Sequence, residues 1–249
     1  MKDIIREKYQ KLREDFAELN LLQRVVNDAF KREFEVLAEH EKSNDPSKIV
    51  SHEAFGFDNP FSGRLEKYAF RKTTIKTLKE ITVSHKNTQY CWLIADAFEK
   101  FEKYLKFVYE RLTTRKERDL KKILSYFSNN YDSLKKNEET NAFEVNLKIA
   151  VLLVEKLRHA IVHNQGKIED LEIFTNKVIN DSGINNNRDE HELFISQFFI
   201  ENRVTLLESP IADGLLLQRY HNVYRHVASY LLSYAYLVNE VIVQPEESV

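Results

Sequence analysis

The chain has 249 residues, which is long enough for one large domain with an apolar core. Only five glycines and four prolines, with 31% charged residues, favour long helices over a turn-rich fold. The formal net charge of −2 excludes a global attraction to nucleic acid, and the single cysteine, Cys91, excludes both a disulfide framework and a cysteine-based zinc site.

The ends and the hydropathy of the chain bear on its location. The N-terminal segment MKDIIREKYQ is charged rather than apolar, so no signal peptide is expected. No run approaches the roughly 18 apolar residues of a membrane-spanning helix, so no membrane contact is expected. The neighbours Tyr90 and Trp92 predict a buried thiol for Cys91. These features predict a soluble cytoplasmic protein.

Residues 2–40 predict one long helix, because apolar residues recur every three, four or seven positions with charges on the other faces. Such a face needs a partner, which is either the following helices or a second copy. Residues 41–62 contain Asn-Asp-Pro and Asp-Asn-Pro, with glycines nearby, and predict a loop. The loop divides the chain into an N-terminal helix with its loop (1–62) and a helical bundle (63–244).

The remaining elements follow from the same periodicity. Helices are predicted over 63–85, 88–114 with Asn87 as its cap, 116–136, 143–166, 167–180 and 211–241. Asparagine-rich residues 180–190 predict a loop, and aromatic and β-branched residues predict one small β-hairpin over 193–208. The polar tail 244–249 is expected to fray. The fold class is therefore mainly α, an antiparallel helical bundle with one small hairpin.

The helix predicted over 143–166 is the most informative stretch. Its apolar residues have the period of a helix with one buried face, and it ends in His163-Asn164-Gln165-Gly166, a helix stop signal. Arg158, His159 and His163 therefore collect at the C-terminal end of a core helix. Three basic groups in that position favour a binding or catalytic site.

The segment Leu157–Asn164, LRHAIVHN, resembles the signature of the HEPN superfamily, which is an arginine, a polar residue, a few further residues and a histidine late in a helix of an all-α bundle. Many members of that superfamily are metal-independent endoribonucleases, often toxins or phage-defence effectors, and others have lost activity. The resemblance implies catalytic roles for Arg158 and His163, and a supporting or RNA-binding role for His159 and Asn164.

RNA cleavage by the 2′-hydroxyl needs a base, an acid and a group that stabilises charge on the phosphate oxygens. Histidine suits the proton transfers because its unperturbed pKa is near neutrality, and arginine suits the third role. One motif supplies too few groups, and the resemblance implies a homodimer in which two motifs face one cleft. It also implies no metal or other cofactor, a 2′,3′-cyclic phosphate product, and a nucleotidyltransferase-like antitoxin as a possible partner.

Other interpretations of these residues remain open. Arg158 could bond a carboxylate while His163 only caps the helix. Glu155, His159 and His163 are spaced by four and could bind a metal, although Arg158 would repel a cation. The chain could also be an inactive HEPN module that serves in dimerisation, RNA binding or protein interaction.

Two further segments bear on the motif. HEPN members often have an acidic residue on another core helix that orients the motif, and Glu99 is the candidate here, although Glu99 and Lys103 also form an ordinary surface pair. Arg219 and His226 have a similar spacing to the motif, but they are predicted in the middle of a helix, with Tyr220 in place of a small polar residue.

Overall fold

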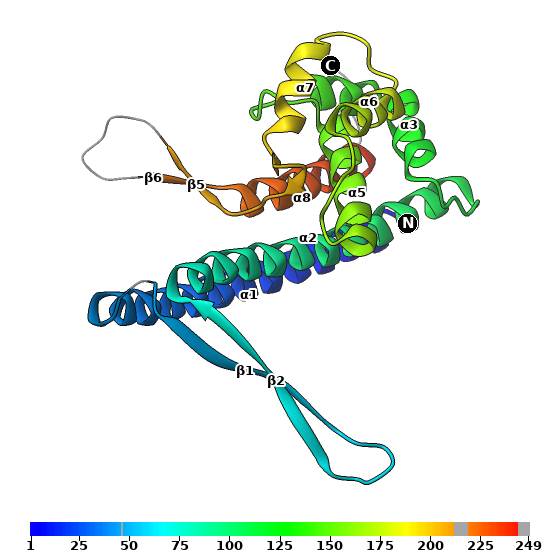
Figure 1. Ribbon diagram of the computed structural model, residues 1–249. Coiled ribbons are helices and arrows are strands. Elements are labelled where there is room, and N and C mark those ends of the chain that lie inside the picture. Colours follow the sequence, from blue (N-terminus) through cyan, green and yellow to red (C-terminus); the bar gives the residue numbers. More distant parts are fainter. Residues whose placement is uncertain (46, 212–218, 244–249) are drawn as a thin grey trace. The chain divides into compact units, whose positions relative to one another are not determined.

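The computed structural model of the chain describes residues 1–45, 47–211 and 219–243 (Figure 1). The fold is mainly α with small antiparallel strand pairs, which confirms the predicted fold class. In chain order the elements are α1 (Lys2–Ser43), β1 (Ile49–Asp58), β2 (Leu65–Thr74), α2 (Ile75–Thr113), α3 (Leu120–Asn130), α4 (Asp132–Glu139), α5 (Leu147–Asn164), α6 (Leu171–Ser182), α7 (Arg188–Ser196), β3 (Phe199–Ile200), β4 (Arg203–Val204), β5 (Glu208–Ile211), β6 (Arg219–Asn222) and α8 (Val223–Val243).

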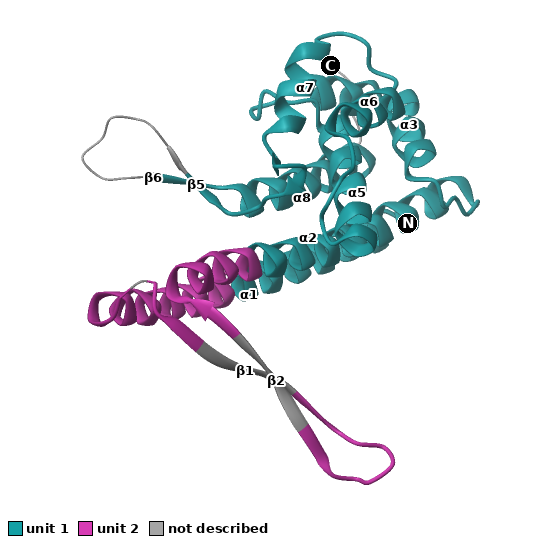
Figure 2. Ribbon diagram, viewed as in Figure 1, with its two compact units in different colours: residues 1–23, 87–249 teal, residues 24–86 magenta. Residues whose placement is uncertain are grey.

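The chain forms two compact units (Figure 2). One unit comprises residues 1–23 and 87–249, and the other comprises residues 24–86. These bounds differ from the division at residue 62 that the sequence favours, because the long helices α1 and α2 each contribute to both units. All the residues of the candidate site belong to the first unit.

The structure of residues 24–86 differs from the sequence prediction in two places. Residues 49–58 are a strand rather than part of a loop, and residues 65–74 are a strand rather than the start of a helix. The two strands pair antiparallel from Ile49 opposite Thr74 to Asp58 opposite Leu65, with irregular register in between. A tight turn joins them. It is closed by the Asn59 side chain, whose Oδ1 accepts hydrogen bonds from the backbone N–H of Phe61 at 2.8 Å and of Ser62 at 3.1 Å.

Within the same unit the end of α1 packs against the start of α2. Lys79 forms an ion pair with Glu41 at 2.7 Å, and its ammonium group lies 5.5 Å from the ring centre of Phe34. Lys86 donates a hydrogen bond to the side-chain oxygen of Asn27 at 2.7 Å. From the apolar face predicted for residues 2–40, Ile5, Leu12 and Leu37 are buried in the single chain.

Helix α2 is continuous through Asn87, which was predicted to cap a separate helix. Asn87 is buried, and its amide donates to the carbonyl oxygen of Val204 at 2.8 Å while its Oδ1 accepts from the N–H of Leu206 at 2.8 Å. The side chain thus pairs with a distant strand instead of the start of its own helix. Cys91 is buried as predicted, and burial raises the pKa of its thiol to about 12.

The core of the larger unit is built around α5, which packs against α8 and α6. The start of α1 joins it, and the ring of Tyr9 lies 6.0 Å from that of Tyr104 on α2. A buried polar contact links α3, α4 and α8. The carboxylate of Glu138 accepts hydrogen bonds from the hydroxyl groups of Ser128 at 2.8 Å and Tyr234 at 2.7 Å, which satisfies an otherwise costly buried acid.

Several predicted bounds also change. The helix predicted over 116–136 is two helices, because Tyr131 adopts extended backbone between α3 and α4, and α4 continues to Glu139. The hairpin near 193–208 is confirmed in a shorter form, β3 with β4, since α7 occupies its first residues.

The last helix begins at Val223 rather than residue 211, because residues 208–211 and 219–222 pair as β5 and β6. The predictions for 212–218 and 244–249 lie outside the described residues.

No helix among the described residues is long and apolar enough to cross a membrane.

Candidate functional site

Helix α5 carries the candidate site and is fixed at its start by a cap. The side-chain oxygen of Asn146 accepts hydrogen bonds from the backbone N–H groups of Lys148 at 3.0 Å and Ile149 at 3.2 Å. The helix therefore begins at Leu147, and Phe143 lies outside it. Its apolar residues are almost fully buried, so its C-terminal turns hold their basic side chains on a rigid element.

The C-terminus of α5 closes where the sequence predicts, with one change of residue. Gln165 adopts left-handed backbone with φ 54° and ψ 34°, and the N–H of Gly166 donates to the carbonyl oxygen of Ala160 at 2.9 Å. Within the predicted stop signal, Gln165 rather than Asn164 takes the left-handed position, because Asn164 is the last helical residue; its side chain is exposed. The chain therefore turns sharply just after His163.

Arg158 lies half-buried on α5 without a counterion. Its guanidinium makes no hydrogen bond or ion pair with any residue that the structure describes, so it does not bond a carboxylate. Glu99 on α2 is near it but forms its ion pair with Lys103 at 2.7 Å. The hydrogen bond and charge of Lys103 lower the pKa of Glu99, and the positive charge of Arg158 lowers it further. Glu99 is thus a neighbour of Arg158 rather than its partner.

His159 and His163 lie together on another face of α5. Their ring centres are 4.6 Å apart with the planes inclined by 48°. Partial desolvation lowers the pKa of His159, and the nearby positive charges of His163, Lys177 and Lys156 lower it further. The neutral imidazole is therefore favoured in the free protein. Within the described ranges, His163 makes no hydrogen bond to a helix carbonyl.

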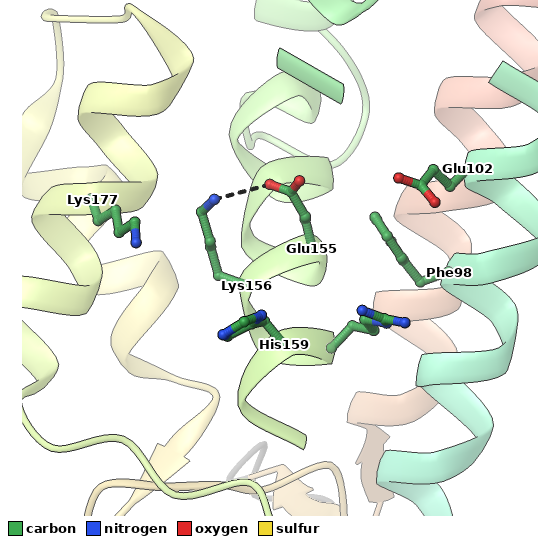
Figure 3. A pocket seen from close by; sticks show the side chains of 7 residues that line it. Phe98, Glu102, Glu155, Lys156, His159 and Lys177 are labelled. Atoms are coloured by element: carbon green, nitrogen blue, oxygen red, sulfur yellow. Dashed lines mark hydrogen bonds and ion pairs between the residues drawn. The ribbon is translucent and has the colours of Figure 1, made fainter. Parts of the chain in front are cut away.

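A pocket of about 300 Å³ opens beside these residues, between α2, α5 and α6 (Figure 3). We call it the Arg158 pocket. Its lining residues are Phe98, Glu102, Glu155, Lys156, Arg158, His159 and Lys177. Figure 3 shows Lys177 extending from α6 toward α5, while Phe98 and Glu102 extend from α2 on the other side of α5.

The carboxylates of the Arg158 pocket are paired with lysines. Glu155 accepts from Lys156 at 3.1 Å, and Glu102 pairs with Lys106 at 2.8 Å. Lys156 also binds Asp181 at 3.1 Å. Lys177, like Arg158, has no acidic partner in the part of the chain that the structure describes. The pocket therefore offers Arg158 and Lys177, together with the His159 imidazole, to an anion.

His163 does not line the Arg158 pocket. Five residues along an ideal helix turn by about 140°, so the side chains of Arg158 and His163 leave α5 in different directions. A single chain brings Arg158 and His159 together, and places His163 against His159 but outside the pocket. The two residues of the motif therefore do not meet at one point within one chain.

The alternative interpretation of Glu155, His159 and His163 as metal ligands is not supported. No group of three or more histidine, cysteine or acidic side chains in the described ranges could hold a metal ion. Glu155 is engaged by Lys156, and His159 is surrounded by positive charges, which disfavour a cation.

Sequence reasoning missed Lys156 and Lys177. Lys156 lies on α5 only two residues before Arg158, but its orientation toward His159 depends on the helix register. Lys177 enters from α6 and is brought to the pocket by the packing of α6 against α5. The sequence spacing between residues 158 and 177 carries no periodic signal that could have identified it.

Comparison with known proteins finds no match: no family model, no curated protein and no solved structure is similar to this chain.

Proposed function

We propose that this protein is a HEPN-like, metal-independent endoribonuclease that cleaves RNA by attack of a 2′-hydroxyl at a homodimeric site, and that it acts as a toxin or phage-defence effector. The observation that carries the proposal is the Arg158 pocket, where a half-buried arginine without a counterion lies beside His159 and Lys177. A half-buried positive charge without a partner lowers the stability of the fold, so a purely structural role does not explain it. Such a charge suits a site that binds a phosphate.

Each group has a chemical role in the proposed reaction. The guanidinium of Arg158 binds the non-bridging phosphate oxygens and stabilises the charge that grows on them, with Lys177 adding a second cation. A neutral imidazole accepts the proton of the 2′-hydroxyl as its oxygen attacks phosphorus. The lowered pKa of His159 suits that role. A second imidazole protonates the 5′-oxygen as the P–O5′ bond breaks, which leaves a 2′,3′-cyclic phosphate and a 5′-hydroxyl.

The second imidazole is the reason why the proposal needs two copies. His163 lies outside the pocket that holds Arg158 in its own chain. In a symmetric dimer with the ends of two α5 helices facing each other, the His163 of the second copy can approach the phosphate held by the first. The imidazoles perform the proton transfers, so no step of the proposed reaction uses a metal.

The test is RNA cleavage in EDTA by the purified protein and four variants. Arg158→Ala and His163→Ala are expected to lower the rate by about 10²–10⁴-fold, because each removes charge stabilisation or a proton transfer. Arg6→Ala and His40→Ala replace the same residue types at exposed positions of α1 and are expected to cleave as the parent does. The product should carry a 2′,3′-cyclic phosphate, and a strand with 2′-deoxyribose at the cut should remain intact.

The second candidate function is an inactive HEPN module that serves in dimerisation, RNA binding or protein interaction. The observation that favours it is that Arg158 and His163 do not share a pocket within one chain. RNA left intact across a broad panel of sequences, with binding still lost in Arg158→Ala, would support this candidate over the nuclease. A nucleotidyltransferase-like antitoxin is a partner of the first candidate only, since an inactive module needs no restraint.

A further inference from the structure

A second pocket, of about 450 Å³, lies between α2, the end of α5 and β4. We call it the Trp92 pocket. Trp92 and Thr88 line it from α2, Gln165 and Val162 from the α5 end, and Arg203 from β4. It shares no lining residue with the Arg158 pocket.

The strand that carries Arg203 is held firmly in place. The N–H of Val204 donates to the carbonyl oxygen of Gly166 at 2.8 Å, which ties β4 to the turn that ends α5. The amide of Asn87 holds the same strand to α2 through the carbonyl of Val204 and the N–H of Leu206. The pocket is therefore built from three elements that are already fixed together, and a ligand need not order it.

Trp92 is the only tryptophan of the chain, and 51% of its surface is exposed although its neighbours Cys91 and Leu93 are buried. An exposed indole ring at the edge of a pocket can stack against a flat ring of a ligand. Trp92 lies on the exposed face of α2, between Thr88 and Asp96, where the neighbouring exposed side chains are polar. Packing within the chain does not account for its exposure.

The polar groups of the pocket suit the edge of a heteroaromatic ring. The side-chain amide of Gln165 can both donate and accept hydrogen bonds, and it is exposed at the left-handed turn. The guanidinium of Arg203 lies close enough to Cys91 for its charge to act on the thiol, and it has no acidic partner in the described part of the chain. A flat ring with hydrogen-bonding edges, such as a nucleobase, fits this combination.

The two pockets follow one another along the contact between α2 and α5. On α5, Arg158 and Val162 are four residues apart and so lie on one face of the helix, and Gln165 follows at the left-handed turn that ends it. On α2, Trp92 and Phe98 are six residues apart, a rise of about 9 Å. The earlier residues of α2 and the later residues of α5 line the Trp92 pocket, and the later residues of α2 and earlier residues of α5 line the Arg158 pocket. Because α2 lines both pockets, one strand of RNA can extend from one pocket to the other.

We infer that the Trp92 pocket binds an unpaired base of the RNA whose phosphate is held by Arg158, so that the protein selects single-stranded or looped RNA. The inference rests on the proposed function for its choice of RNA over a free nucleotide. A base in a duplex is stacked and paired and cannot enter a pocket of this kind without being extruded.

Binding is measured without cleavage by using the His163→Ala variant and a short single-stranded RNA, followed by both tryptophan emission and RNA anisotropy. Trp92 is the only tryptophan, so its emission reports the pocket alone. The expected result is saturable quenching that follows the anisotropy, with much weaker binding of a fully paired RNA. In the same background, Trp92→Ala should weaken binding by about 5–150-fold, the loss of one base stack.

Trp92→Phe should keep most of the affinity, and Tyr220→Ala, which removes another exposed aromatic outside both pockets, should leave it unchanged. Anisotropy without quenching, or equal affinity for paired RNA, overturns the inference. A mononucleotide that binds as tightly as the strand overturns the choice of RNA. Quenching without cleavage by the parent protein removes the nuclease proposal alone, whereas cleavage that is insensitive to Trp92→Ala removes this inference alone.

Discussion

The positive charge of Arg158 lies half-buried near Lys156, His159 and Lys177, with no acidic partner among the described residues. Such a charge lowers the stability of the free protein, because it loses water and repels its neighbours. An anion bound in the pocket would remove that cost. A structural arginine would instead be held by a carboxylate, as Lys156 is held by Glu155 and Asp181.

Arg158→Met is therefore expected to leave the free energy of unfolding unchanged within about 0.5 kcal/mol or to raise it, while RNA binding is lost. Chemical denaturation with the parent as reference measures the first effect, and anisotropy measures the second. A structural role for Arg158 predicts the opposite pattern, a loss of about 1–3 kcal/mol with RNA affinity retained.

The charges around His159 give a second prediction at this scale. Desolvation and the cations His163, Lys177 and Lys156 lower its pKa below the ordinary 6.5, so the protonated form appears only at a lower pH. Lys177→Ala removes one positive charge and should move the pKa of His159 up toward 6.5. NMR titration of the ring protons measures this directly and requires no activity.

Lys136→Ala is the matched control, since Lys136 is exposed and lies outside the pocket. This substitution should leave the pKa of His159 unchanged. A His159 pKa at or above 6.5 in the parent, or a downward shift in Lys177→Ala, would show that the charges of the pocket do not act on this imidazole as the geometry requires.

At the scale of the elements, α2 lines both pockets, and its Asn87 side chain forms hydrogen bonds to β4 and the residues after it. Asn87→Ala leaves the buried carbonyl of Val204 and N–H of Leu206 without this partner. A loss of about 2–4 kcal/mol in the free energy of unfolding is expected from two such groups. Asn137→Ala removes an exposed amide on α4 and should cost less than about 0.5 kcal/mol by the same denaturation measurement. An equal, small effect of both substitutions would mean that β4 is held by other contacts.

The elements also show what local sequence patterns can and cannot predict. Helices with a long apolar period, such as α1 and α5, were placed to within a few residues, because their burial follows from spacing along one chain segment. Strands β1 and β2 were missed, since each depends on pairing with the other rather than on its own period. Asparagine is a common N-cap residue, so the sequence predicts a helix start at Asn87. Its hydrogen bond to the distant strand β4 explains why Asn87 lies within a helix instead.

The same limit applies to the site. The motif residues on α5 could be identified, because a helix end and three basic residues are local features. The different directions of Arg158 and His163 also follow from their spacing, since five residues of an ideal helix turn by about 140°. The other residues that line the pockets could not be predicted in this way. Lys177 and Arg203 reach the two pockets only through packing of α6 and β4 against α5, which no local pattern encodes.

At the scale of the whole molecule, the proposed reaction requires two copies of the chain. The Arg158 pocket lacks the His163 of its own chain. A dimer places the missing imidazole only if it brings the ends of two α5 helices together. The active form should therefore depend on protein concentration, with the specific cleavage rate falling as the protein is diluted below the dimer dissociation constant.

Complementation between two inactive variants tests this claim most directly. Arg158→Ala and His163→Ala proteins with different affinity tags are refolded together, and the doubly tagged heterodimer is isolated and incubated with RNA in EDTA. The heterodimer keeps one Arg158 on one chain and one His163 on the other. This heterodimer is expected to cleave RNA although each variant alone does not. A doubly tagged heterodimer as inactive as either variant, or the failure of the chains to associate at all, would contradict this claim.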